Sequence, residues 1–68
     1  MKKFISQPYQ LAQNKKWIPA GTIAEIVKDK ILFIEIEMRQ NEFNSKEEAH
    51  IFFVDYYTEQ GYQEGWTS

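Results

Sequence analysis

The sequence predicts an α+β fold, in which a small antiparallel sheet of about three strands carries one helix packed on one face. Two features predict it. A segment of alternating apolar and charged residues near the middle of the chain is typical of a half-buried strand, and the segment after it carries both a helix start and a helix stop signal. The 68 residues suffice for a single domain, residues 1–68, in the order strand, strand, strand, helix.

The helix is expected over about residues 46–60. Ser45 and Glu48 have the spacing of a capping box, in which the two side chains satisfy two otherwise unpaired backbone N–H groups. Gly61 can adopt the left-handed conformation that follows the last turn of a helix. The apolar residues between these signals recur at the spacing of one buried helix face. That face comprises Ala49, Phe52, Phe53, Tyr56 and Tyr57.

Three strands are expected before the helix. Residues 31–39 form the clearest one, and residues 22–28 form a second. Residues 4–11 alternate loosely, and Pro8 restricts this first strand to an edge or irregular position. After the helix, we expect the tail around Trp66 to pack back on the domain or to add a short C-terminal edge strand. The expected partners of the helix face on the third strand are Leu32, Ile34, Ile36 and Met38.

The turn at Asp29-Lys30 leaves two registers open for the hairpin. A two-residue loop would set Glu25 against Ile34 on the helix-facing side, whereas a three-residue loop would place Ile26 there. We favour the three-residue loop, because it buries no charge. The face away from the helix then carries apolar residues from both strands. These residues are Ile23, Val27, Ile31 and Phe33.

A second apolar surface is expected on the outer side of the helix, at Ile51 and Val54. Exposed apolar patches commonly mark interfaces, and a core of this size rarely supplies more than ~3–5 kcal/mol of net stability. We therefore expect a non-enzymatic protein-interaction domain that self-associates, as a homodimer, or binds a protein partner. The expected interface residues are Ile23, Val27, Ile31, Phe33, Ile51 and Val54.

Composition limits the functional classes. The chain has no cysteine, which excludes disulfides and thiolate metal ligands, and its formal net charge is −2. Its first residues meet polar residues and a proline before any apolar run of signal-peptide length develops. The longest apolar run, residues 31–34, is far too short to span a bilayer. We expect a cytoplasmic protein that does not associate with membranes.

The candidate chemical groups do not form a catalytic or metal-binding motif. His50 is the only histidine, and without cysteine the chain lacks the nucleophile and base pair that acyl transfer usually needs. Glu47 and His50 have the spacing that puts a carboxylate and an imidazole on one helix face, but di-iron sites of this kind draw their ligands from four helices. We predict that the protein is not an enzyme and uses no cofactor or metal.

An alternative function is that of a nucleic-acid accessory protein. Lys15, Lys16 and Trp17 combine charge with an aromatic ring, as single-strand-binding surfaces do when bases stack on the ring and phosphates meet lysine. The acidic overall balance and the single arginine make this the second choice.

The order of strands followed by a helix that opens Ser45-Lys46-Glu47-Glu48-Ala49 resembles small bacterial domains of the HicB antitoxin type. In those domains a hairpin leads to a helix with a Thr/Ser-x-x-Glu-Ala start. The chain is also similar to uncharacterised bacterial proteins that combine a tyrosine, a Trp-x-Pro segment and this helix start, here Tyr9, Trp17-Ile18-Pro19 and Ser45 to Ala49. The resemblance implies a sheet with one packed helix and a role in binding a protein partner.

Overall fold

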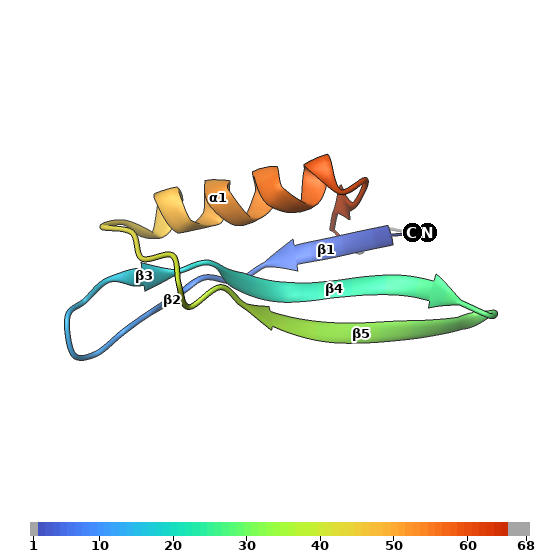
Figure 1. Ribbon diagram of the computed structural model, residues 1–68, viewed down its shortest axis with the longest axis horizontal. Helices are drawn as coiled ribbons and strands as arrows, with labels where there is room; N and C mark the ends of the chain where they lie inside the picture. Colours follow the sequence, from blue (N-terminus) through green and yellow to red (C-terminus); the bar gives the residue numbers. More distant parts are fainter. Residues whose placement is uncertain (1, 66–68) are drawn as a thin grey trace.

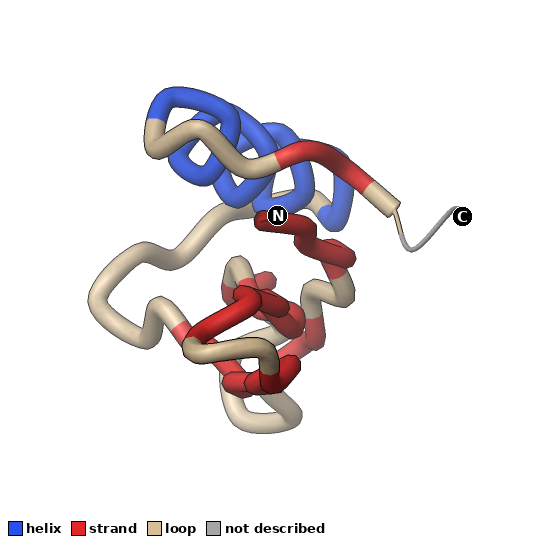
Figure 2. Tube along the Cα trace, turned by 90° about the vertical axis from the view of Figure 1, so that its right-hand side faces the viewer, coloured by secondary structure: helices blue, strands red, loops and turns tan. Residues whose placement is uncertain are grey.

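The computed structural model describes residues 2–65 and confirms the α+β class, with one helix and a mostly antiparallel sheet in this range (Figure 1). The elements in chain order are β1 (Lys2–Ser6), β2 (Tyr9–Gln10), β3 (Trp17–Ile18), β4 (Ala20–Val27), β5 (Lys30–Glu37), α1 (Lys46–Glu59) and β6 (Gln63–Glu64). The main sheet has the strand order β5-β4-β1-β6, while β2 and β3 form a separate two-stranded sheet. The end-on view in Figure 2 shows the helix on one side of the strands.

The helix begins where the sequence predicts. The backbone N–H of Glu48 donates to the Ser45 hydroxyl at 3.2 Å, and this hydroxyl donates in turn to the Glu48 carboxylate at 3.1 Å. The expected capping box places the carboxylate on the Ser45 backbone N–H, whereas here the carboxylate accepts from the hydroxyl. The Ser45 oxygen still satisfies one of the free N–H groups of the first turn, so α1 starts at Lys46.

The helix ends in a Schellman motif at the predicted glycine. Gly61 has a φ of +92°, and its N–H donates to the Thr58 carbonyl at 3.1 Å. The N–H of Tyr62 donates to the Tyr57 carbonyl at 2.9 Å, and the two tyrosine rings meet edge to face with centroids 5.2 Å apart. This hydrophobic contact commonly accompanies the motif. The turn directs the chain back along β1, where β6 forms.

The helix meets the sheet over β1. Its buried residues are Ala49, Phe53 and Tyr57, which lie four positions apart. The Phe4 ring of β1 packs against this row, with centroids 5.9 Å from Phe53 and 6.2 Å from Tyr57. Tyr56, which the sequence places on the buried face, is exposed instead. The helix is therefore rotated relative to the expected face, and its contact row is narrower.

The first strand is expected to be an edge or irregular strand over residues 4–11. The segment is interrupted at residues 7–8, but its first part does not lie at an edge. β1 lies inside the sheet, antiparallel to β4 and parallel to β6. It ends at Ser6, so Pro8 falls in the following connection and removes no hydrogen bond from the ladder. The short C-terminal strand is present as β6, and the N–H of Gly65 donates to the Phe4 carbonyl at 2.7 Å. Trp66 lies outside the described residues.

Neither expected register of the hairpin forms. The loop between β4 and β5 is Lys28-Asp29, and both residues have positive φ, 51° and 66°. This is the geometry of a two-residue type I′ turn. This turn sets Ile23 opposite Ile34 on the face of the sheet that the helix packs against, and Ile23 belongs to the core cluster there. A one-residue slip moves a whole strand to the other face, so the placement of Ile23 and Val27 on the outer face is wrong.

Gly21 lies where the neighbouring strand and the helix leave no room for a side chain. A Cβ at Gly21 would lie 2.1 Å from the Ile5 carbonyl oxygen and 2.8 Å from a Phe53 ring carbon. We expect Gly21→Ala to lower the free energy of unfolding by about 2 kcal/mol or more, because overpacking against backbone cannot relax. Urea unfolding measures this, with Thr22→Ala as the control. A loss as small as that of Thr22→Ala would contradict the prediction.

Tyr57 gives the fold a defined alkaline sensitivity. Burial, reinforced by the neighbouring Tyr56 and Tyr62, raises the pKa of Tyr57 above its usual value of 10.0. The unfolded chain therefore loses this phenol proton at a lower pH than the folded chain does. The stabilisation is complete below pH 10 and is lost as the pH rises through the folded pKa. Urea midpoints measured from pH 8 to 11.5 should fall above pH 10, and Tyr57→Phe should flatten that fall.

Candidate protein-interaction surface

The β4–β5 hairpin projects beyond the rest of the fold. The molecule measures 42 × 20 × 18 Å, and Figure 1 shows the hairpin extending along the long direction. β1 pairs with β4 only as far as Lys2 opposite Glu25, whereas the ladder between β4 and β5 continues to Val27 opposite Lys30. The helix contacts β1, β3, β4 and β6. Residues 26–34 are here called the arm. Residues 26–31 extend past the end of β1, and residues 32–34 lie on the terminal strand, opposite the β4 residues that pair with β1.

The arm carries six of the eight exposed large apolar side chains of residues 2–65. Its large apolar side chains are between 41% and 66% exposed. They occupy both faces, because opposite residues in the ladder share a face. Val27, Leu32 and Ile34 lie on the helix side of the sheet, and Ile26, Ile31 and Phe33 lie on the outer side. Contiguous apolar surface of this kind marks interaction sites in small proteins.

β5 is also the terminal strand of the main sheet. In a hairpin with a two-residue loop, the residues that flank the loop form a hydrogen-bonded pair, and such pairs alternate along the ladder. Lys30, Leu32 and Ile34 therefore bond toward β4, while Ile31 and Glu35 direct their N–H and C=O groups to the outer edge. The N–H of Met38 donates to the Pro19 carbonyl at 2.9 Å, which fits this alternation. The arm thus combines apolar side chains with the terminal strand of the main sheet.

The predicted interface residues separate into three environments. Val27, Ile31 and Phe33 lie on the arm. Ile51 is exposed on the helix. The remaining pair, Ile23 and Val54, belongs to the core cluster or packs against it. Ile23 is 6% exposed and does not reach the surface, because the register places it beneath the helix.

Three arm residues were not expected at the surface: Ile26, Leu32 and Ile34. Alternation places the last two beneath the helix, and the prediction that they pack against it is wrong. On that strand face, the residues that pack against the core cluster are those at the end away from the turn, Ile36 and Met38. The sequence feature that could have indicated this surface is the unbroken apolar run at residues 31–34, because a strand with one solvated face needs apolar residues only at alternate positions.

Charged groups mark the base of the arm. The Arg39 side chain donates to the Glu37 carboxylate at 2.9 Å, and the Tyr9 hydroxyl donates to the same oxygen at 3.4 Å. Hydrogen bonds with Tyr9 and Glu37 raise the pKa of the Arg39 guanidinium. Beside them, an open depression of about 520 Å³ runs from the end of β5 to the helix, and its walls include Met38 and Tyr56. The base of the arm therefore adjoins a surface that carries charged groups and a partly apolar depression.

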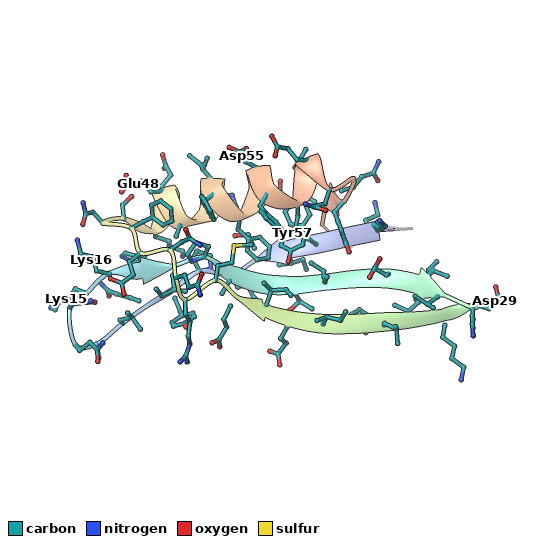
Figure 3. The ribbon with its side chains drawn as sticks, viewed as in Figure 1. Lys15, Lys16, Asp29, Glu48, Asp55 and Tyr57 are labelled. Carbon is teal, nitrogen blue, oxygen red and sulfur yellow. The ribbon has the colours of Figure 1, made fainter. Side chains whose placement is uncertain are left out.

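The residues of the alternative nucleic-acid surface lie at the opposite end of the molecule from the turn residue Asp29 (Figure 3). Lys15 is exposed in the turn that joins β2 and β3, and the Lys16 ammonium donates to the Asn44 side chain. Trp17 is half-buried. The lysines at the tip of the arm lie far from this turn, so the cationic residues are not gathered on one surface.

The remaining candidate group lies between the start of the helix and β1. His50 Nδ1 is 2.9 Å from the Ser6 hydroxyl oxygen, beside an open depression that Glu47 also lines. Within residues 2–65, no three side chains of the types that bind metals come together. No helix in the same range has the length and apolar character needed to cross a bilayer. The arm is accordingly the strongest candidate site.

Comparison of the chain with known protein families, with curated proteins and with solved structures finds no match. The resemblance to HicB-type domains therefore stays a prediction.

The arm residues should be dispensable for folding. We expect Ile31→Lys and Leu32→Lys each to change the free energy of unfolding by less than about 1 kcal/mol, because both side chains are already exposed. Ile23→Ala, which empties a core position, should cost about 2–4 kcal/mol. Denaturation at sub-micromolar concentration, where association contributes little, makes the comparison. Equal losses at Leu32 and Ile23 would show that the arm belongs to the core.

Proposed function

We propose that the chain is a non-enzymatic protein-binding domain that takes an extended segment of its partner onto the edge of β5. The observation that carries this proposal is the arm itself, which joins a terminal strand to apolar side chains on both of its faces. In strand addition the backbone supplies hydrogen bonds, and the alternating side chains supply contacts on each face. The arm offers both.

The sequence of β5 between Lys30 and Glu35 carries no lysine and no proline. Natural edges carry lysine or proline, a bulge or a covering element. In β5 the charges stand at the ends, at Lys30, Glu35 and Glu37, while the apolar run at residues 31–34 is uninterrupted. An edge of this composition invites association, and a partner strand would cover it.

The proposed role is cytoplasmic, because a chain without cysteine suits a reducing compartment. The alternative role in binding nucleic acid through Lys15, Lys16 and Trp17 has less support. Lys16 is already engaged by Asn44, and the lysines are divided between the two ends of the molecule.

A strand peptide tests the proposal. The probe is a synthetic peptide with the sequence of residues 29–38, and the control is the same peptide with proline in place of Ile31 and Phe33. We expect the amides of Ile31 and Glu35 to shift and to become protected from hydrogen exchange, since they point to the edge. The amide of Leu32, which is bonded to β4, should keep its exchange rate. Amide spectra of labelled protein measure both effects.

Binding of the control peptide as strongly as the probe would contradict strand addition, as would shifts centred on Ile51 or Lys16. Protection of Ile31 and Glu35 before any peptide is added would mean that the edge is already occupied by another copy.

A further inference from the structure

The face of β5 on the helix side of the sheet is only partly covered. A helix is about 10 Å wide, or about two strand spacings, and α1 packs over β1 and β4. Leu32 and Ile34 of the terminal strand point to the same side of the sheet as the helix, yet they are 46% and 41% exposed. An apolar strip therefore runs along β5 beside the helix.

The flank of α1 beside this strip is aromatic. Phe52 and Tyr56, one turn apart on the helix, line the open depression of about 520 Å³ together with Ile36 of β5. Ile36 follows Ile34 on the same face of the strand, so the depression continues into the apolar strip. The strip and the depression are here called the groove. Its floor consists of Leu32, Ile34 and Ile36, and its wall consists of Phe52 and Tyr56.

We propose that the groove binds an amphipathic helix of a partner protein, with basic residues along the flank that faces α1. Neighbouring packed helices have their axes about 8–10 Å apart, so a second helix beside α1 would lie over β5. From Leu32 to Met38 the groove is roughly 20 Å long at ~3.3 Å per residue, which suits ~13 residues of helix. This site is the face of β5 and not its edge, so the inference goes beyond the proposed function.

The charge of the wall selects a basic partner. Glu48 precedes Phe52 by four positions and Glu59 follows Tyr56 by three, which places both carboxylates on the helix stripe that forms the wall. Both glutamates are exposed. Lysine or arginine on the facing flank of the partner would meet these carboxylates, and such complementarity favours a basic helix over an acidic one.

The cations near the groove do not neutralise this wall. Arg39 lies at the base of the arm, where it donates to the Glu37 carboxylate. Lys30 lies at the tip, opposite Val27. The lysine of α1, Lys46, lines the depression on the opposite flank of the helix. The floor between the two ends of the groove is apolar.

The same charges argue against a second copy of the chain as the occupant. The helix that a second copy offers is α1, and its exposed apolar residue is Ile51. Glu47 and Asp55 lie one turn before and one turn after Ile51. A second copy would therefore bring acidic side chains to an acidic wall, and like charges that face each other disfavour association.

A pair of synthetic peptides tests the chemistry of the partner. Each has about 13 residues of alanine and leucine, with leucine on one helix face. The probe carries lysine on both flanks of that face, and the control carries glutamate instead. In calorimetry at low ionic strength, we expect the lysine peptide to bind at least ten-fold more tightly, with amide shifts centred on Ile34, Phe52 and Tyr56. Equal affinity of the two peptides, or no binding of either, would overturn the basic helix as the occupant.

Charge reversal on α1 tests the position of the contact. Glu59→Lys should weaken binding of the lysine peptide at least five-fold and strengthen binding of the glutamate peptide. Glu47→Lys is the matched control, because it changes the net charge equally but lies on the opposite flank. It should leave the affinity within two-fold. Equal effects of the two substitutions would show that only net charge matters and would overturn the groove.

Two neighbouring residues of β5 test which face of the sheet is used. Leu32→Lys places a cation on the floor of the groove and should weaken binding of the lysine peptide at least five-fold. Ile31→Lys places the same charge on the outer face and should leave the affinity within two-fold. Both side chains are already exposed, and circular dichroism confirms that each variant folds. A greater loss for Ile31→Lys would contradict binding in the groove.

The groove and the edge of β5 give distinguishable results. A lysine peptide that shifts the amides of Ile31 and Glu35, instead of those of Phe52 and Tyr56, would overturn the groove and support the proposed function. A chain that binds the lysine peptide in the groove but ignores the strand peptide would support this inference and contradict the proposed function.

Discussion

The contact of the Phe4 ring with Phe53 and Tyr57 decides where the helix lies, and much of the remaining structure depends on it. Phe4 stands on β1, which is inside the sheet, so the helix settles over β1 and β4. A single helix of this length cannot also cover β5, at the end of the strand order. The position of one aromatic ring therefore determines which apolar residues become core and which remain at the surface.

The core that results is small. The cluster of buried side chains beneath the helix consists of Phe4, Ile23, Phe53 and Tyr57, and a few partly buried residues pack against it. Much of the remaining aliphatic surface of the chain lies on the arm, where folding alone does not remove it from water. Folding and association would then draw on different residues. A substitution on the arm could weaken association while the domain keeps its structure.

The sequence predicts the local features of this fold well. Ser45 and Gly61 mark the ends of the helix through chemistry that operates within one turn, and both signals function in the structure. The register of the hairpin depends on the exact position of the turn, which the residue types at the turn do not indicate. Lys28 and Asp29 form a type I′ turn without the asparagine or glycine that usually announces it, and a displacement of one residue exchanges the two faces of β4.

The candidate surface could be predicted only in part for a related reason. Alternation assigns each strand residue to a face, but it does not say how far the neighbouring strand and helix extend. The pattern places Val27, Ile31 and Phe33 at the surface, although Val27 lies on the helix side and not on the outer side. It assigns Leu32 and Ile34 to the core, and both are exposed. Their exposure follows from their place on the terminal strand and from the position of the helix over β1 and β4, which are properties of the assembled molecule. The turn at the tip shows a similar dependence on surroundings. Two left-handed residues other than glycine cost conformational energy there. Lys28 and Asp29 thus stand at positions where backbone preference alone would favour other residues, and the tip carries its two charges at a cost in backbone energy.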